Sequence, residues 1–246
     1  MSSHGLSKSR IIAWKQCPKR LWLQIHRRDL LEVSDDTKQS FQIGYEVGEV
    51  ARGLYPDGIL IKDDDDLSAA LESTKTVILA YPDHPIFEAT FQRDGLSVRI
   101  DLLLPTNGGY RMVEVKASAS VKPYHLDDIA VQAWVMKQNN IPLHSIELAH
   151  IDTSFVYHGD GDYQGIFRHE KLDDGIYPLL EKVPDWIQEA RRTLSGGEPV
   201  IEPGGQCNDP FECPFIAYWT QHIKEPEQPE YSLDVLYRMQ TVTKYA

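Results

Sequence analysis

The sequence has few cysteines and no long apolar run, and each shortage excludes a class of protein. Three cysteines, an odd number, are too few for a disulfide framework and favour thiols or metal ligands in a reducing compartment, so we expect the cytoplasm. No run of about 18 apolar residues occurs, so we expect no membrane span. The first thirty residues are basic but lack a continuous apolar segment, which argues against a secretory signal.

Positive charge is also scarce, because 25 lysines and arginines face 37 aspartates and glutamates, which gives a formal net charge of −12. Taken alone, this excess of acid argues against nucleic acid as a partner. The distribution qualifies the objection, since residues 1–31 contain seven basic residues and one acidic residue. Exposed charges further apart than a Debye length of roughly 8 Å are largely screened, so an acidic protein can still present a basic groove. An ordinary solvated surface is the alternative for this segment.

Two partly alternating apolar runs, residues 97–104 and 110–116, flank an Asn-Gly-Gly turn and predict an antiparallel hairpin. If the turn is centred directly after Asn107, residues whose numbers sum to 215 face each other. Asp101 then lies opposite Glu114, with a Cβ separation of roughly 4.5–5.5 Å. Two carboxylates that close repel unless a cation lies between them or one of them keeps its proton. The sequence therefore predicts a paired-carboxylate site on this hairpin.

Lys116 lies two residues beyond Glu114 and therefore points to the same sheet face. A divalent metal held by two carboxylates, with an ammonium group beside it, suits phosphodiester hydrolysis. The metal lowers the pKa of a bound water, and the lysine holds that water or stabilises charge on the phosphate. An ordinary solvated hairpin face is the alternative. Both carboxylates, however, lie within apolar runs typical of a buried central strand, where an unpaired charge is energetically costly and therefore points to a functional role.

The rest of the pattern predicts a single α/β domain in which helices pack on a mixed sheet and a terminal lobe joins both chain ends. The segment from Ser195 onward is rich in glycine and proline, so it is a poor candidate for an independent core. Helices are predicted at 37–55, from about Leu67, at 123–139 and at 173–194, and further strands at about 76–81, 86–93, 145–151, 154–157 and 165–169.

Five of these residues together resemble the PD-(D/E)XK nuclease superfamily, and specifically its RecB-like branch: Asp101, Glu114, Val115, Lys116 and Gln132. The resemblance implies that Asp101 and Glu114 bind Mg²⁺ or Mn²⁺ and that the Val115 carbonyl adds a ligand. It also implies that Lys116 positions or polarises the attacking water. Gln132, on a later helix, would help to position the active site or the substrate.

Two positions depart from the family pattern. The glutamine motif usually carries a tyrosine four residues later, where this chain has Met136. In an earlier helix, many relatives place a metal-binding histidine four residues after a glycine, whereas here Gly44 is followed at that spacing by Gly48. We expect Glu49, which adjoins the vacant position, to substitute as a catalytic metal ligand. Glu46, or an ordinary solvated helix face, is the alternative.

The cysteine-bearing segments near the two chain ends are similar to the iron–sulfur members of that branch. Those members include the CRISPR-associated RecB-like exonucleases and related uncharacterised bacterial proteins. They use four cysteines, whereas this chain has Cys17, Cys207 and Cys213, with Trp219 near the position of the last ligand. The resemblance implies a structural [4Fe-4S] cluster that joins the chain ends. His222 is the nearest fourth ligand; the same set would suit zinc, and free structural thiols remain a third alternative.

The resemblance covers most of the chain and implies one RecB-like nuclease domain over residues 1–222, with a restriction-endonuclease-like mixed sheet flanked by helices. Segments 1–36 and 200–222 would pack together in the cysteine-bearing lobe, and 223–246 would form an acidic tail. The implied activity is metal-dependent hydrolysis of DNA, in single strands or at ends, by an exonuclease rather than an endonuclease, within a larger nucleic-acid-processing complex. The alternatives are a catalytically weak binding or complex-forming subunit that retains the fold, and a nuclease acting on RNA or junctions.

Overall fold

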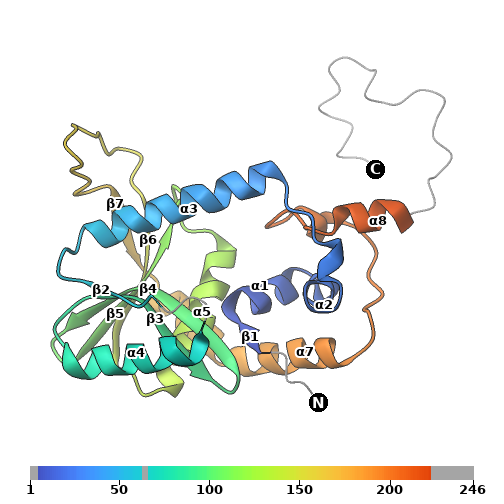
Figure 1. The fold of residues 1–246 in the computed structure, drawn as a ribbon, viewed down its shortest axis with the longest axis horizontal. Helices are drawn as coiled ribbons and strands as arrows, with labels where there is room; N and C mark the ends of the chain where they lie inside the picture. Colours follow the sequence, from blue (N-terminus) through green and yellow to red (C-terminus); the bar gives the residue numbers. More distant parts are fainter. Residues whose placement is uncertain (1–4, 63–65, 223–246) are drawn as a thin grey trace.

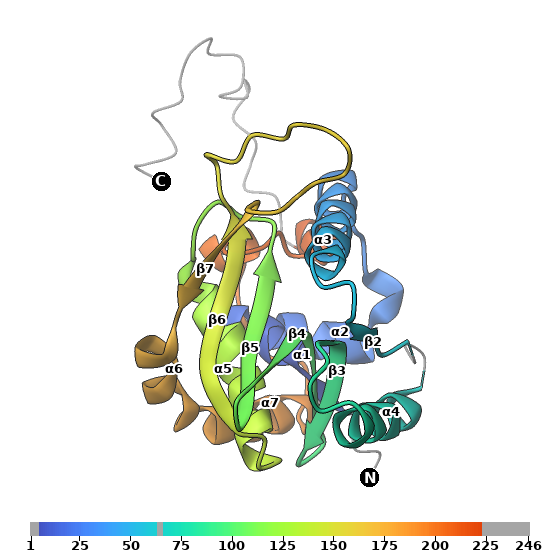
Figure 2. The ribbon, with the colours of Figure 1, turned by 90° about the vertical axis from the view of Figure 1, so that its left-hand side faces the viewer.

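A seven-stranded mixed sheet forms the centre of the molecule, and helices cover both of its faces (Figures 1 and 2). The computed structural model describes residues 5–62 and 66–222, without the side chains of 220–222. The sheet order is β2-β3-β4-β5-β6-β7, and β1 pairs with β4 off this path. The strand bounds are β1 (Leu6–Ser7), β2 (Ile59–Leu60), β3 (Ile86–Arg93), β4 (Leu96–Thr106), β5 (Gly109–Lys116), β6 (Leu143–Ile151) and β7 (Phe167–Lys171). The predicted α/β class, a mixed sheet flanked by helices, is confirmed.

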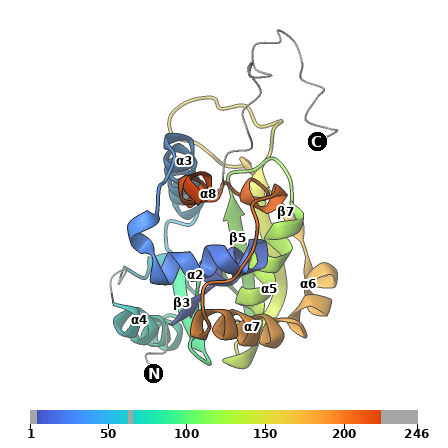
Figure 3. The ribbon, with the colours of Figure 1, turned by 90° about the vertical axis from the view of Figure 1, so that its right-hand side faces the viewer.

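The helices divide between the two faces of the sheet. Their bounds are α1 (Lys8–Gln16), α2 (Pro18–His26), α3 (Asp35–Gly53), α4 (Leu67–Ala80), α5 (Pro123–Gln138), α6 (Asp173–Leu180), α7 (Val183–Ser195) and α8 (Ile216–His222), with short 3-10 helices η1 (Arg28–Leu30) and η2 (Gly205–Cys207). The main core joins one sheet face to apolar residues of α1, α2 and α4 to α7. On the other face, Ala51 of α3 packs with Leu102, Leu104 and Val113 (Figure 3). The sheet therefore separates α3 from α5.

Polar caps and prolines set where the helices begin. Ser7 and Ser34 accept hydrogen bonds from backbone N–H groups in the first turns of α1 and α3, and Asp66 does the same for α4. Pro18 and Pro123 stand in the first turns of α2 and α5, where no intrahelical N–H donor is needed. Within the described residues, no helix is long and apolar enough to cross a membrane.

The two ends of the described chain meet in a cysteine-bearing lobe, as the sequence predicts. Leu23 of α2 packs in one apolar cluster with Cys207, Cys213 and Phe215. The side-chain amide of Gln16 donates to the carbonyl groups of residues 206 and 211, at 2.8 and 2.6 Å. These contacts tie α1 and α2 to the segment that precedes α8 (Figure 1). The predicted acidic tail at 223–246 lies outside the described residues.

The strand predicted at 76–81 is wrong, because this segment is the C-terminal part of α4 and the residue after it. Its run of β-branched residues favours a strand locally. Ala70 and Thr74 are buried, however, and Val77 and Ile78 pack against the main core. That spacing is helical, so burial of one helix face outweighs the local propensity.

The single helix predicted at 173–194 is also wrong, because the chain forms α6 and α7 instead. Pro184 has no N–H to donate to the carbonyl of Leu180, so the helical hydrogen-bond pattern is broken there. The strand predicted at 154–157 is absent, because Ser154 lies in a turn and residues 155–157 form neither helix nor strand; the strand that follows begins at Phe167.

Candidate active site

The register of the β4–β5 hairpin agrees with the prediction, because all five paired positions have residue numbers that sum to 215. Regular pairing ends one position before Asp101 and Glu114. At that point the Asp101 carboxylate accepts a hydrogen bond of 2.8 Å from the backbone N–H of Val115. The side chain therefore takes the place of a backbone acceptor, which holds the carboxylate beside β5.

Glu88 of β3 brings a further carboxylate to the other side of Asp101. The residues before and after Glu88 pair with Leu102 and Ile100, the two neighbours of Asp101 on β4. Glu88 has a φ of 56°, in the left-handed region that residues other than glycine uncommonly adopt. Its carboxylate lies 3.4 Å from the guanidinium of Arg52 on α3. Such backbone outliers cluster at functional sites, so this position supports a functional interpretation.

Glu114 is the centre of the cluster, with only 2% of its side chain exposed. Its Oε1 accepts hydrogen bonds from the ammonium groups of Lys116, at 2.5 Å, and Lys8, at 2.9 Å. Its Oε2 accepts a hydrogen bond of 2.7 Å from the amide of Gln132. Lys8 directly follows β1, whose parallel pairing with β4 brings the start of α1 to this site. Three elements therefore fix one buried carboxylate.

Asp128, one turn before Gln132 on α5, completes the ion-pair network. It lies 2.8 Å from the ammonium of Lys116 and 3.6 Å from that of Lys8. The Oε1 of Gln132 is buried and has no hydrogen-bond partner in the described part of the chain. A buried acceptor of this kind needs an explanation, and a metal-bound or substrate-bound water would satisfy it.

Burial and the neighbouring charge of Glu114 raise the pKa of Asp101 to about 7. Burial also opposes ionisation of Glu114, but the ammonium groups of Lys116 and Lys8 outweigh it and hold the pKa of Glu114 below its usual range. The pKa of Lys116 is raised in turn, because the surrounding carboxylates outweigh the effect of burial. The two strands therefore carry one readily protonated carboxyl and one permanently charged carboxylate, as the predicted repulsion requires.

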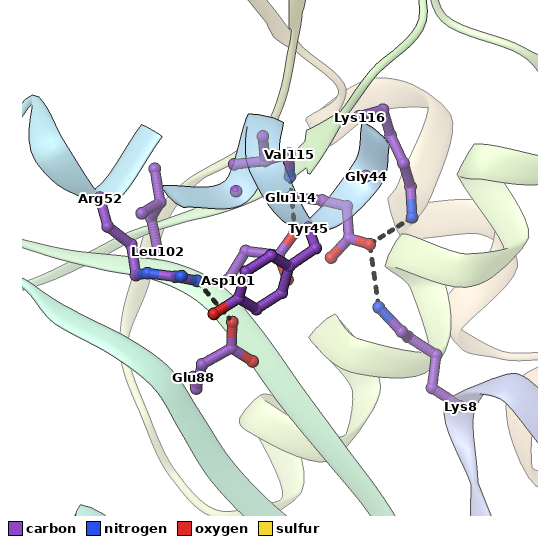
Figure 4. A pocket seen from close by; sticks show the side chains of 11 residues that line it. Lys8, Gly44, Tyr45, Arg52, Glu88, Asp101, Leu102, Glu114, Val115 and Lys116 are labelled. Atoms are coloured by element: carbon purple, nitrogen blue, oxygen red, sulfur yellow. Dashed lines mark hydrogen bonds and ion pairs between the residues drawn. The ribbon is translucent and has the colours of Figure 1, made fainter. Parts of the chain in front are cut away.

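The cluster opens into a cavity of about 280 Å³ (Figure 4). The sheet supplies its carboxylates and Lys116, α1 supplies Lys8, and α3 covers the opposite side. Its lining residues are Lys8, Gly44, Tyr45, Gly48, Arg52, Glu88, Asp101, Leu102, Glu114, Val115 and Lys116. The structure therefore brings together the predicted residues of β4 and β5. Gln132 does not line the cavity but donates a hydrogen bond to Glu114.

Glu49 does not join this group. It is exposed and does not line the cavity, and neither does the alternative Glu46. The reason is the rotation of α3, which is fixed where Ala51 packs on the sheet and which directs other residues of the helix toward the cavity. The carboxylate that lines the cavity beside Asp101 is Glu88 instead.

Lys8, Arg52 and Glu88 are the charged residues of the cavity lining that the sequence did not identify. Lys8 is one of seven basic residues in the first 31, and its position depends on pairing with a distant strand. Glu88 had a signal, because it interrupts the apolar run 86–91 as Asp101 interrupts its own. Arg52 had none beyond its place on the same helix as Gly48.

The donor set suits a hard divalent cation in chemical type. Mg²⁺ prefers oxygen ligands and commonly uses one or two carboxylates together with waters. Among residues 5–62 and 66–222, no group of three or more His, Cys, Asp or Glu side chains is arranged to hold a metal ion. A cation would therefore rest on Asp101 and Glu114 with water, and the ammonium of Lys8 or Lys116 would turn away from Glu114 to admit it.

The cysteine lobe fits a metal less well. Cys17, Cys207 and Cys213 are free and buried, but the described residues do not form a metal-holding group with them. Burial raises the pKa of the Cys213 thiol, which opposes the thiolate that a metal requires. Trp219 is itself buried, with the ammonium of Lys19 3.7 Å from its ring centroid. The side chain of His222, the predicted fourth ligand, lies outside the described part.

Comparisons with known proteins give no family assignment. No protein-family model and no curated protein matches the chain. Among solved structures, the chain is similar to the crystal structure of SSO0001, with 12% sequence identity and a TM-score of 0.36, over 75% of this chain and 77% of the other. A likeness at this level supports no functional argument, so the site is interpreted from its own geometry.

Proposed function

We propose that this protein is a metal-dependent nuclease of the RecB-like type that hydrolyses DNA phosphodiester bonds, in single strands or at ends. The observation that carries the proposal is the convergence of Asp101, Glu114 and Lys116 on one cavity from neighbouring strands. Buried charges are costly unless they are paired, so a cluster of this kind in the centre of a sheet is unusual without a functional role.

Each residue has a distinct part in the proposed reaction. Asp101 and Glu114 would hold a Mg²⁺ or Mn²⁺ ion, which supplies Lewis acidity and lowers the pKa of a bound water. Lys116 lies beside Glu114 and can orient the attacking water or stabilise charge on the phosphate. Lys8 approaches Glu114 as well and can face the same phosphate. Gln132 fixes the orientation of Glu114 through its Oε2.

We place this activity in the cytoplasm and within a larger nucleic-acid-processing complex. The support for a reducing compartment is that Cys17, Cys207 and Cys213 are free thiols. The support for a nucleic-acid partner is the cationic N-terminal segment, whose Lys8 reaches the cavity despite the acidic composition of the chain.

A second candidate function is a catalytically weak DNA-binding or complex-forming subunit. The observation that favours it is that two ammonium groups already neutralise Glu114, together with the hydrogen bond from Gln132. A carboxylate so fully paired within the protein has less capacity for a metal.

End-labelled single-stranded DNA, double-stranded DNA and RNA, incubated with Mg²⁺, Mn²⁺ or EDTA, test the proposal. We expect wild-type protein to cleave DNA only with metal, and Asp101→Asn to be inactive. Shortening from one end would identify an exonuclease. DNA binding in EDTA without cleavage in either metal would contradict the proposal and favour the binding subunit. Cleavage of RNA alone would contradict DNA as the substrate and assign RNA instead.

A further inference from the structure

Two large aromatic side chains on α3 are exposed next to the cavity. Phe41 is 68% exposed and Tyr45 is 60% exposed, and their spacing of four residues puts them on one helix face. Tyr45 also lines the cavity, where its ring lies 6.0 Å from the guanidinium of Arg52 (Figure 4). Contiguous exposed apolar groups of this kind mark interaction sites.

The surface of α3 beside Tyr45 is formed by two glycines, which have no side chains. Gly44 and Gly48 both line the cavity, although glycine inside a helix is unfavourable relative to alanine. A Cβ at Gly44 would meet nothing within 4 Å, and one at Gly48 would meet only the side chain of Arg52, at 3.7 Å. The protein's own packing therefore does not require these glycines. They leave room for a ligand to approach the α3 backbone next to an exposed ring.

Positive charge lies across the cavity from this helix face. Lys8 and Lys116 line the cavity from α1 and β5. Outside the cavity lining, Arg10 of α1 and Arg28 of η1 form no ion pair among the residues that the structure describes. Burial and the positive charge of Arg28 lower the pKa of Arg10, so two guanidinium groups lie near each other without an acidic partner. Aromatic rings on one side and cations on the other suit a nucleic-acid strand, whose bases stack and whose phosphates are anionic.

We infer that Tyr45 and Phe41 form a base-stacking surface that holds unpaired nucleotides beside the cavity. This inference rests on the proposed function for the phosphate that occupies the cavity, and it selects single-stranded or frayed DNA as the bound form. Base faces are hidden by stacking inside a duplex but are available in a single strand. Tyr45, which lines the cavity, would stack the nucleotide nearest the reacting phosphate, and Phe41 the next one along α3.

Binding of fluorescent oligonucleotides by the full chain in EDTA tests the inference without cleavage. We expect Tyr45→Ala to weaken single-strand binding about 5- to 150-fold, the range for losing one base–aromatic stack, while Tyr45→Phe keeps the wild-type affinity. Phe41→Ala should weaken binding in the same way. Tyr177→Ala is the matched control, because Tyr177 is 50% exposed on α6 and lies outside the cavity. Alanine is a good helix former, so these exposed positions should tolerate it.

Three results would overturn the inference: wild-type affinity in Tyr45→Ala and Phe41→Ala, an equal loss in Tyr177→Ala, or no single-strand binding by wild type. Self-association of the wild type that Tyr45→Ala abolishes, without DNA binding, would assign this face to a second copy of the chain instead. If wild type cleaves duplex DNA and Tyr45→Ala binds single strands as tightly as wild type, the nuclease proposal is supported and the stacking surface is contradicted. A binding loss in Tyr45→Ala without cleavage by wild type would support the stacking surface and count against the nuclease.

Discussion

Replacing Asp101 by asparagine should stabilise the folded protein while it abolishes cleavage. Burial and the charge of Glu114 raise the pKa of Asp101 to about 7 in the folded protein. In the unfolded chain the ordinary value is about 3.9. Because the folded form binds the proton more tightly, Asp101 makes the free energy of unfolding fall as the pH rises from about 4 to 7. Asparagine has no charge to desolvate and can still accept the hydrogen bond from Val115.

The pH dependence gives the size of the effect. Each tenfold change in the ionisation equilibrium corresponds to about 1.4 kcal/mol. At pH 8 the carboxylate would be charged in both states, and the displaced pKa costs about 4 kcal/mol of folding free energy. At pH 5 the folded form is mostly protonated, and the same linkage costs about 1 to 2 kcal/mol. The advantage of Asp101→Asn over wild type should therefore be about 2 to 3 kcal/mol larger at pH 8 than at pH 5.

Urea unfolding at both pH values, in EDTA, measures this difference. EDTA is needed because a metal bound to the folded state would add its own stabilisation. Asp57→Asn, at an exposed aspartate in a turn, is the control for the loss of one acidic residue outside the site. An advantage of Asp101→Asn that is the same at pH 5 and pH 8, or a loss of stability that grows with pH, would refute the reasoning about the paired carboxylates.

Two further predictions concern other parts of the molecule. Glu147 is 2% exposed and accepts two hydrogen bonds from Arg111, at 2.9 and 2.7 Å. Despite its burial, the hydrogen bonds from His169 and Arg111 hold the pKa of Glu147 below its usual range. Its contribution to stability is therefore present above about pH 4.3 and is lost on acidification. Arg111 is 38% exposed, so solvent partly screens its charge. Glu147→Gln should therefore lower the free energy of unfolding by about 2 kcal/mol at pH 7, and by less at pH 3, as measured by thermal denaturation. An unchanged melting temperature at pH 7 would contradict this. In the cysteine lobe, the packing of Cys207 and Cys213 with Phe215 leads us to expect an unchanged melting temperature after chelation and no stoichiometric iron or zinc by elemental analysis. About four irons per chain, lost in Cys17→Ser, would instead support the cluster that the resemblance implies.

The centre of the site was predictable because it is local in sequence. The hairpin register depends on a turn between adjacent strands, and it places Asp101 beside Glu114 without any knowledge of the rest of the chain. Lys116 follows from the two-residue period of a strand. The family resemblance placed Gln132 at the active site, but only the structure shows its hydrogen bond to Glu114, since helix position relative to a sheet is not encoded in either segment alone.

The residues that the sequence could not place depend on long-range packing. Lys8 reaches Glu114 only because Leu6 pairs with Leu96, and a two-residue strand carries almost no local signal. Glu88 faces the cavity through an unusual backbone conformation at an interruption of the β3–β4 ladder. Glu49 adjoins the expected ligand position along the chain, but the rotation of α3 is set by its tertiary contacts.

Cleavage of end-labelled DNA with Mn²⁺ by wild type, Lys116→Ala and Lys75→Ala, prepared in parallel, tests the central claim most directly. Lys75 is 69% exposed on α4 and does not line the cavity, so Lys75→Ala should retain full activity. Removing a group that stabilises charge in a reaction commonly lowers the rate roughly 10²–10³-fold, and we expect a loss of this size in Lys116→Ala with DNA binding preserved. Equal metal-dependent cleavage by all three proteins would contradict the assignment of the active site, and no cleavage by folded wild type in Mg²⁺ or Mn²⁺ would contradict the nuclease itself.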